Sequence, residues 1–277
     1  MARWLKILAG TGLAGAIAVG ALWFQARGEG VFAHHHLFHA DFDGDADGPY
    51  GRAAVAHDFS PPWADGIDEG RADIVSSPCG KALRVRYPAG AVGKGVIIPV
   101  RLPVHQALYL AYDVYVPVGF DFVKEGKLSG LCGGTCNSGG NRPTGRDGWS
   151  SRVIWRAGGQ LAQYVYAPGQ AGPYGDILYW KDAVLTAGRW HHIETYVQVN
   201  RPGQADGVIR SWFDGRMAFS DDHVRLRDTD AFAIDTFKFE TFFGGGAPDF
   251  APGEAQFLLF DNITVDDRQG PAGACSQ

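Results

Sequence analysis

Serine, arginine and tyrosine alternate with other residues in the segment GWSSRVIWRAGGQLAQYVYAP, which starts at Gly148. In a β-strand, residues two positions apart point to the same side and lie roughly 7 Å from each other. Ser150 and Arg152 would therefore share one face of a first strand, and Tyr164 and Tyr166 one face of a second. The Ala-Gly-Gly between them predicts a hairpin that brings the two polar faces together. A solvated polar face is the ordinary interpretation of such a hairpin.

These side chains also suit β-elimination on a polymer of uronic acid. The C5 proton of a uronate is weakly acidic, so its removal needs a cation or hydrogen-bond donor that stabilises the charge spreading onto the carboxylate. Arg152, with Lys127 in the upstream segment GKLSGL, supplies positive charge, and arginine can grip a carboxylate with two parallel bonds.

Tyrosine can supply the base and the acid that this reaction also requires. Its ordinary pKa is about 10, and we expect the neighbouring cations to lower that pKa by favouring the phenolate. Such a mechanism requires no metal ion and no nucleotide.

The same residues resemble those of polysaccharide lyase family 14, the alginate and glucuronan lyases with a β-jelly-roll fold. The likeness is sharpest in FVKEGKLSGLCGG, in the Ser-x-Arg motif and in the Tyr-x-Tyr motif, which begins twelve positions after Arg152. It implies that Lys127, Ser150, Arg152, Tyr164 and Tyr166 occupy the family's catalytic and substrate-binding positions. Lys127 and Arg152 would neutralise the substrate carboxylate, and Ser150 would bond a sugar hydroxyl. One tyrosine, with Tyr166 preferred, would transfer the proton, making the protein a carbon–oxygen lyase.

Further polar residues are weaker candidates. Arg142 and Arg146, in the glycine-rich NSGGNRPTGRDGW, are predicted to bind additional uronate units, although loop arginines are often merely solvated. His191 and His192 are adjacent, so in a strand at most one of them faces a groove. A non-catalytic jelly roll that binds acidic glycans is the main alternative function. Glycoside hydrolysis ranks last, because no strand signature for two flanking carboxylates is visible.

Short runs of alternating apolar and polar residues, bounded by Gly, Pro, Asn or Asp, fill the chain after residue 30. They are typical of β-strands, and no long helical period is visible among them. Asp-Gly after Phe213 is a strong turn signal. We therefore expect an all-β fold, a jelly roll or sandwich of two antiparallel sheets with a concave substrate groove. Its domain would cover residues 38–267, and residues 268–277 would form a tail.

Residues 1–27 differ from this body. Arg3 and Lys6 precede an apolar run from Ile7 to Phe24, which is near the length needed to span a bilayer. The segment is predicted to be either a signal peptide or a retained membrane anchor, and residues 28–37 a histidine-rich connector. In both cases we expect the body to be exported, whether secreted, periplasmic or anchored facing outward.

Four cysteines agree with an exported protein, in which an even count favours disulfides. Pairing Cys132 with Cys136 would close a small glycine-rich loop and leave Cys79 to pair with Cys275. A four-cysteine zinc site is the alternative, but the sequence contains no Cys-x-x-Cys pair.

The charge balance bears on the partner. The 277 residues include 25 basic and 30 acidic side chains, for a net charge of −5, which gives no global field to attract nucleic acid. The expected partner is an acidic polysaccharide, bound by a monomer. DGDADG, starting at Asp43, matches the first half of a calcium loop, but Ala54 stands where the loop requires glutamate. A polar turn is therefore favoured over calcium, and no other cofactor is expected.

Overall fold

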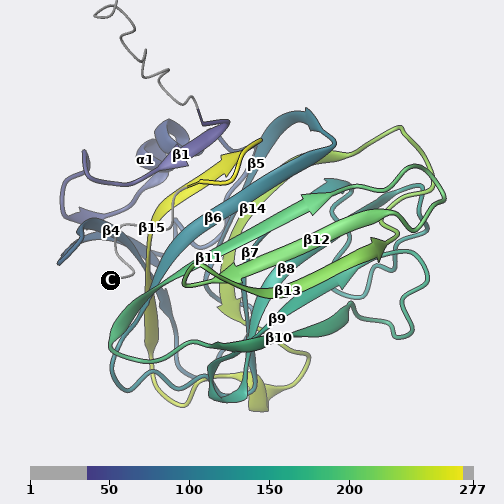
Figure 1. Cartoon of the computed structure of the whole chain (residues 1–277). Coiled ribbons are helices and arrows are strands. Elements are labelled where there is room, and N and C mark those ends of the chain that lie inside the picture. The colour runs from purple at the N-terminus through teal and green to yellow at the C-terminus, as the bar shows by residue number, and fades with distance from the viewer. Residues whose placement is uncertain (1–35, 271–277) are drawn as a thin grey trace, which may run out of the picture. The chain divides into compact units, whose positions relative to one another are not determined.

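The computed structural model describes residues 36–270, which form fifteen strands in two antiparallel sheets (Figure 1). The nine-stranded sheet contains, in spatial order, β13 (Arg216–Val224), β12 (Gly207–Phe213), β11 (Arg189–Gln198), β6 (Ala107–Val116), β15 (Gln256–Asp266), β4 (Gly80–Tyr87), β3 (Ala72–Ser77) and β2 (Gly48–Pro49), while β1 (Phe38–Ala40) pairs with β15. The six-stranded sheet contains β10 (Asp176–Val184), β9 (Gln160–Tyr166), β8 (Gly148–Arg156), β7 (Glu125–Gly134), β14 (Ile234–Phe243) and β5 (Val96–His105).

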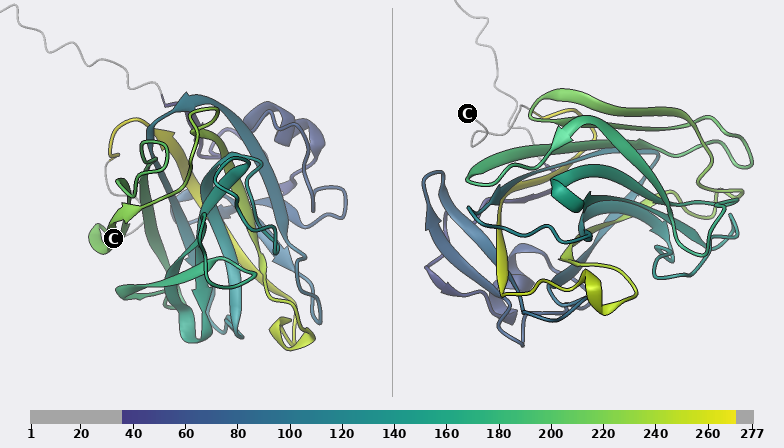
Figure 2. Two further views of the ribbon diagram at one scale, coloured as in Figure 1. Left: turned by 90° about the vertical axis from the view of Figure 1, so that its right-hand side faces the viewer. Right: turned by 90° about the horizontal axis from the view of Figure 1, so that it is seen from below.

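The last two strands lie in the middle of the two sheets. β14 inserts between β7 and β5, and β15 inserts between β6 and β4, so that segments distant in sequence become neighbours. The two sheets stack as two layers, which Figure 2 shows from two further directions. The expected all-β sandwich of two antiparallel sheets is therefore confirmed.

The core lies between these layers. On β8, Trp149, Val153 and Trp155 are buried in it, as their alternation with the polar residues predicts. Trp155 packs edge-on against Phe243 of β14, with ring centroids 5.3 Å apart. Burying a large apolar side chain of this kind contributes about 1.5–3 kcal/mol. Because one face of the six-stranded sheet is fixed against the core, the face that carries Ser150 and Arg152 points away from it.

The predicted hairpin between β8 and β9 is present, and its register is now defined. Arg152 lies opposite Tyr164, and Ser150 lies opposite Tyr166. The connecting turn is η1 (Ala157–Gly159), where both glycines have positive φ. This turn brings the arginine and the two tyrosines onto neighbouring strands.

The second predicted turn is also present, between β12 and β13. Asp214 and Gly215 have φ of 48° and 77°, the left-handed pair that a two-residue hairpin turn requires. The structure adds two short helical segments that the sequence pattern did not indicate, α1 (Arg52–Asp58) and η2 (Pro248–Phe250).

The predicted leader and most of the histidine-rich connector lie outside residues 36–270, and so does the end of the predicted tail. Their assignments stay predictions. Within residues 36–270, the helices lack the length and apolarity that a membrane-spanning helix requires.

Candidate active site

A cavity of about 540 Å³ opens on the outward face of the six-stranded sheet. Lys127 of β7, Arg152 of β8, and Tyr164 and Tyr166 of β9 all line it. These four residues come from three adjacent strands, and all four side chains are less than 10% exposed. The structure therefore brings together the cations and phenols that the sequence singled out.

Close packing between β7 and β8 makes room for this arrangement. A Cβ at Gly130 of β7 would lie 2.2 Å from the carbonyl oxygen of Ser151 and 2.7 Å from Cγ of Arg152. The register between the two strands also shifts between Lys127 and Gly130. The glycine lets the arginine side chain pass close over β7, next to Lys127.

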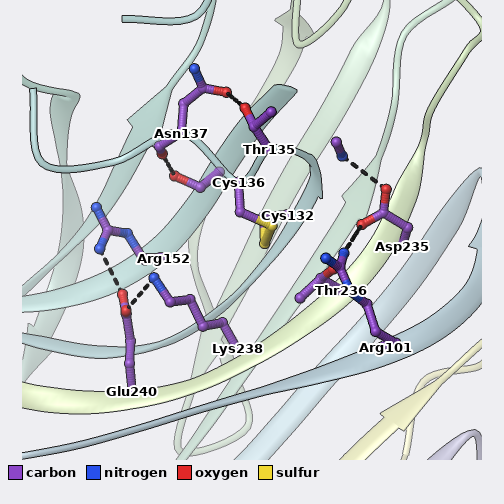
Figure 3. Close-up of a disulfide and its surroundings, with 12 residues drawn as sticks. Arg101, Cys132, Thr135, Cys136, Asn137, Arg152, Asp235, Thr236, Lys238 and Glu240 are labelled. Carbon is purple, nitrogen blue, oxygen red and sulfur yellow. Dashed lines mark hydrogen bonds and ion pairs between the residues drawn. A yellow bond between two sulfur atoms is a disulfide. The ribbon is translucent and has the colours of Figure 1, made fainter. Parts of the chain in front are cut away.

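A buried carboxylate holds Arg152 in place. Nη1 of Arg152 donates to Oε1 of Glu240 on β14 at 2.6 Å, and Nζ of Lys238 lies 2.9 Å from the other oxygen of Glu240 (Figure 3). Burial alone would raise the pKa of Glu240, but the two cations outweigh it and lower this pKa to about 2. Glu240 is thus ionised at neutral pH, and it offsets the cost of burying the charge of Arg152.

Lys127 has a second carboxylate partner, Glu125, two positions earlier on β7. One oxygen of Glu125 accepts from Nζ of Lys127 and the other from Arg156. Burial lowers the pKa of Lys127 to about 8, because Glu125 only partly offsets the desolvation and the nearby charge of Arg152 opposes protonation. The ammonium group of Lys127 therefore loses its proton at a pH only slightly above neutrality.

The two tyrosines that line the cavity are in contact with each other. The hydroxyl oxygens of Tyr164 and Tyr166 lie 3.4 Å apart, and the rings meet edge to face. Nζ of Lys127 lies 4.1 Å from the ring centroid of Tyr164, and Cζ of Arg152 lies 5.1 Å and 5.6 Å from the two tyrosine rings. Such distances allow cation–π attraction.

The expectation that cations lower the tyrosine pKa was wrong for Tyr164. Burial raises the pKa of Tyr164, and its contact with Tyr166 raises it further, so the opposing effect of Arg152 is outweighed. Tyr164 is therefore a neutral hydroxyl at physiological pH, able to donate a hydrogen bond.

Three other predicted site residues are placed differently. Ser150 is buried, and its hydroxyl donates to the carbonyl oxygen of Asn137 at 2.6 Å instead of lining the cavity. Arg142 lines a neighbouring cavity of about 570 Å³, and it donates to the carbonyl oxygen of Gln170 at 2.6 Å.

Arg146 is exposed and acts on Asp228 rather than on the main cavity. The pKa of Asp228 is lowered mainly by Arg225, and Arg146 adds to that effect. The two loop arginines thus have different surroundings: Arg142 borders a cavity that shares Ser138 with the main one, whereas Arg146 lines neither.

Sequence reasoning missed two kinds of residue in the cavity. Glu125 was not singled out, although its alternation with Lys127 on one strand is a usable signal. Glu240 and Lys238 were visible only as the polar side of a strand, because nothing local indicates that β14 lies beside β7. Two aromatic residues also line the cavity: Tyr174, which the sequence offered as a residue that stacks on sugar rings and which is 57% exposed, and Phe250 of η2, which was not predicted.

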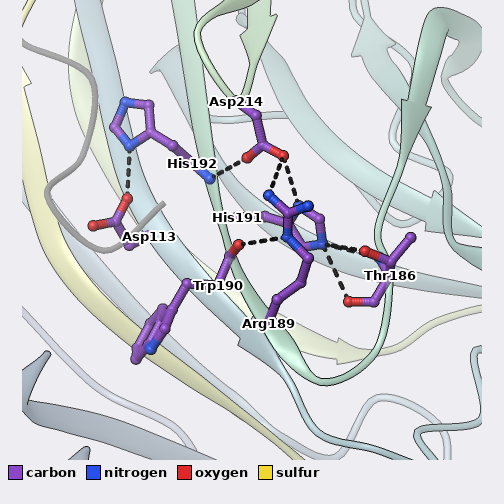
Figure 4. Close-up of polar contacts among 7 residues, drawn as sticks. All are labelled: Asp113, Thr186, Arg189, Trp190, His191, His192 and Asp214. Carbon is purple, nitrogen blue, oxygen red and sulfur yellow. Dashed lines mark hydrogen bonds and ion pairs between the residues drawn. The ribbon is translucent and has the colours of Figure 1, made fainter. Parts of the chain in front are cut away.

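His191 and His192 belong to a separate network on β11 (Figure 4). Nδ1 of His191 lies 2.9 Å from Asp214, and its Nε2 accepts from the backbone N–H of Thr186. Nδ1 of His192 lies 2.7 Å from the buried Asp113. Neither histidine lines the cavity that holds the two tyrosines.

Cys132 and Cys136 form the predicted disulfide. Cys79 forms none within residues 36–270, and its predicted partner Cys275 lies outside them. The bond removes two ligands from the alternative four-cysteine zinc site.

The predicted calcium loop makes protein contacts. Asp43 accepts from the backbone N–H of Lys81 at 2.9 Å, and Asp47 accepts from Nζ of the same lysine at 2.7 Å. No cluster of three or more His, Cys, Asp or Glu side chains suited to a metal ion occurs in the part of the chain that the structure describes. Calcium remains a minority prediction.

Comparison with known families identifies the chain. The family model described as Polysaccharide lyase 14 matches residues 76–263, which is more than half of the sequence. The chain belongs to this family. It is therefore a carbon–oxygen lyase that acts on polysaccharides, and the sequence resemblance is confirmed. A comparison with curated proteins found no match.

Solved structures show the same fold as this polysaccharide lyase. Alginate lyase Aly36B has a TM-score of 0.75 at 24% identity, over 84% of this chain and 98% of the other. The marine PL-14 alginate lyase from Aplysia kurodai has a TM-score of 0.71 at 24% identity, over 84% and 99%. The endo-β-1,4-glucuronan lyase from the fungus Trichoderma reesei has a TM-score of 0.53 at 14% identity, over 84% and 96%.

Proposed function

We propose that this polysaccharide lyase cleaves a uronate polymer by β-elimination, with Lys127 and Arg152 neutralising the substrate carboxylate and a tyrosine transferring protons. The observation that carries the proposal is the meeting of Lys127, Arg152, Tyr164 and Tyr166 in one cavity. A cavity lined by two cations and two phenols suits an anionic substrate from which a proton must be removed.

Arg152 has an unused donor for this purpose. Its Nη1 is committed to Glu240, but its buried Nε has no hydrogen-bond partner within residues 36–270. The guanidinium group has five N–H donors in all, so it keeps donors beyond the one committed to Glu240 with which to bind a substrate carboxylate. Lys127 adds a second positive charge when protonated, and it lines the same cavity as Tyr164.

The chemical step follows from these positions. The C5–H bond of the uronate breaks, and its proton goes to the phenol oxygen of a tyrosine acting as the base, with Tyr166 preferred because Tyr164 is neutral. The electron pair of that bond forms the C4=C5 double bond as the C4–O4 bond breaks. The departing O4 takes a proton from a tyrosine hydroxyl, so one chain end carries a 4,5-unsaturated uronate. Arg152 and Lys127 stabilise the charge on the carboxylate throughout.

Alginate, polymannuronate and glucuronan are the proposed substrates. Aly36B has been solved with an alginate tetrasaccharide after replacement of a lysine and a tyrosine by alanine, and with an alginate trisaccharide. The Trichoderma reesei neighbour is a glucuronan lyase. Both names support a β-1,4-linked or related uronate polymer as substrate.

The test is to incubate the protein with each polyuronate and to follow the ultraviolet absorbance of the new C4=C5 bond. Absorbance should rise with at least one polymer, and the Tyr164→Phe/Tyr166→Phe double variant should abolish it, which excludes a contaminating lyase. A folded protein that produces no absorbance with any of them would refute the proposal. Retention on a uronate column without product, unchanged by Tyr166→Phe, would indicate the non-catalytic binding module instead.

We also propose that the protein acts as an exported monomer. The Cys132–Cys136 disulfide supports an oxidising compartment, where the acidic polysaccharides of cell walls and matrices are also found. Size-exclusion chromatography and the extracellular fraction of expressing cells would test the two parts separately.

A further inference from the structure

The loop at residues 135–141 forms one wall of the cavity, and none of the predicted chemistry accounts for it. Ser138 and Gly139 line the cavity beside Tyr166. The loop follows directly on β7, at the end of the strand that carries Lys127. Its sequence, TCNSGGN, has neither a charge nor an aromatic ring, so it can act on a substrate or on a catalytic side chain only through its backbone and small polar groups.

One backbone group of this loop reaches a phenol. The N–H of Gly140 donates to the hydroxyl oxygen of Tyr166 at 3.3 Å. Gly139 and Gly140 have φ of 62° and 91°, so two consecutive residues lie in the region that favours glycine. This backbone conformation turns the Gly140 amide toward the phenol, and another residue type at either position would be strained.

A disulfide and a hydrogen bond hold the loop against the sheet. The disulfide joins Cys136 at the start of the loop to Cys132 on β7 (Figure 3). The hydroxyl of Ser150 donates to the carbonyl oxygen of Asn137 at 2.6 Å, and Ser150 lies directly opposite Tyr166 in the β8–β9 register. The loop is therefore fastened at the strand position from which Tyr166 projects.

We propose that the Gly140 amide is a further catalytic group, which stabilises negative charge on the Tyr166 oxygen, and that Ser150 and the Cys132–Cys136 disulfide position it. This inference rests on the proposed lyase function and selects between its two phenols. Tyr166 is within reach of two donors, the Gly140 N–H and the neutral hydroxyl of Tyr164, whose raised pKa keeps it protonated.

A phenol oxygen that accepts hydrogen bonds from fixed donors is better able to carry charge before it removes the C5 proton. On this basis Tyr166 is the base, and Tyr164 is its hydrogen-bond donor. Ser150 then acts through the loop and not on a sugar hydroxyl, which agrees with its burial behind the cavity wall.

The kinetic test compares Ser150→Ala and the Cys132→Ser/Cys136→Ser double variant with the native enzyme on the polyuronate that it cleaves best. Because the donor is displaced and not removed, kcat should fall about 10- to 100-fold, with KM changed by no more than about twofold. Treating the native enzyme with a phosphine reductant should lower kcat to the level of the double variant. The double variant itself should not respond to the reductant.

Ser151→Ala is the matched control. Ser151 is the next residue on the same strand, and its hydroxyl accepts from Nε2 of Gln163 at 2.7 Å on the opposite, core-facing side. This variant also loses a buried hydrogen bond, so it should be less stable but keep a kcat within about twofold of the native value.

Amide hydrogen exchange at Gly140, followed by NMR, tests the ties without any substrate. Exchange should be about tenfold faster or more in Ser150→Ala and in the cysteine double variant, and unchanged in Ser151→Ala. Unchanged exchange in all variants would overturn the positioning role. An active enzyme whose Ser150 and cysteine variants keep full kcat would overturn this inference alone, whereas a native protein inactive on every polyuronate would overturn the proposed function and this inference with it.

Discussion

The buried polar cluster of His191 on the nine-stranded sheet and that of Arg152 on the six-stranded sheet differ in what their groups face. On β11, both ring nitrogens of His191 are paired, with Asp214 and with Thr186. On the six-stranded sheet, Arg152 and Lys127 also have carboxylate partners, but both line an open cavity. Burial and ion pairing are therefore common to the two clusters. Asp214 and Arg189 also border a cavity of about 550 Å³, but the histidines do not line it, and the second cluster differs in placing two cations and two phenols together in its own cavity.

The difference shows how a polar cluster becomes a site. A histidine whose two nitrogens are both committed can support a turn, but it has no free position for a proton in transit. In the cavity, by contrast, each cation makes fewer contacts than its donors allow, and the Nε of Arg152 has no partner among the described residues. A shifted pKa indicates a functional site when the same cluster also has hydrogen-bond donors without partners.

The largest expected effect on activity comes from a substitution in the cluster of the six-stranded sheet. Tyr166→Phe removes the oxygen that would carry the proton, while its ring and packing remain. We expect kcat to fall about 10³-fold or more, within the range for loss of a general base, and the unfolding midpoint in urea to change little. Ultraviolet detection of the unsaturated product measures the loss.

A matched control for that substitution is Tyr109→Phe. Tyr109 lies on β6 of the nine-stranded sheet, where its ring packs against Tyr196 at 4.6 Å between centroids. The control should keep kcat within about twofold, since Tyr109 lies on the other sheet and does not line the cavity that holds Tyr166. Equal activity of the Tyr166 and Tyr109 variants would mean that the cavity is not the catalytic centre.

The next largest effect concerns the buried ion pair. Arg152→Met removes one cation from Glu240, leaving a carboxylate that is 0% exposed with Lys238 as its remaining charge partner. The free energy of unfolding should fall by about 3–5 kcal/mol, and kcat/KM should fall about 100-fold as carboxylate neutralisation is lost.

Adding Glu240→Gln tests whether the two losses have separate causes. The double variant should regain much of the stability, because the uncompensated charge is gone, but none of the activity. Urea denaturation and product absorbance, measured on the same preparations, give the two quantities. Recovery of activity together with stability would show that Arg152 serves the fold alone.

Two features could be predicted from the sequence, the all-β fold and the hairpin that carries Arg152 and the two tyrosines. Alternation over GWSSRVIWR and QLAQYVY indicates which residues face the core, and the glycine turn between them predicts a hairpin that brings Arg152 near the two tyrosines. Both depend on residues close together in the chain. Lys127 joins them because β7 pairs directly with β8. The sequence indicated it as an upstream cation, and the family resemblance implied its place in the site.

What could not be predicted depends on long-range pairing. Glu240 reaches Arg152 across 88 residues, because β14 inserts beside β7 late in the chain. No local pattern indicates that insertion. The direction of the shift in the pKa of Tyr164 was predicted wrongly for a related reason. The sequence shows the cations but not how completely the ring is buried. Ser150 was likewise placed on the correct face, but its bond to Asn137 was not visible.

A smaller effect is expected from pH. Lys127 neutralises the carboxylate only when protonated, and its pKa of about 8 means that this form is lost as the pH rises through that value. At about pH 9, roughly a tenth of the lysine keeps its proton, so kcat/KM should fall about tenfold from its value near neutrality. Initial rates on one polyuronate, measured from neutral to alkaline pH, give this alkaline limb of the pH profile.

Two substitutions sharpen that assignment. Lys127→Arg should move the alkaline limb to higher pH, because a guanidinium stays protonated. Glu125→Gln should move it to lower pH, because Glu125 favours the protonated form of Lys127. A limb that does not respond to either change belongs to another group, and the neutralising role would then fall to Arg152.

The smallest effect on activity is expected in the histidine network. His191→Asn breaks the contacts with Asp214 and Thr186 in a buried position that is 1% exposed, so the free energy of unfolding should fall by about 1–3 kcal/mol. Because the imidazole has no unpaired nitrogen and lies on the other sheet, kcat/KM should stay within about twofold of the native value at a temperature where both proteins are folded. Urea midpoints and product absorbance measure the two quantities. If activity instead fell tenfold while the unfolding midpoint stayed the same, the histidine would belong to the catalytic machinery, and the distinction between open and fully paired polar clusters would fail.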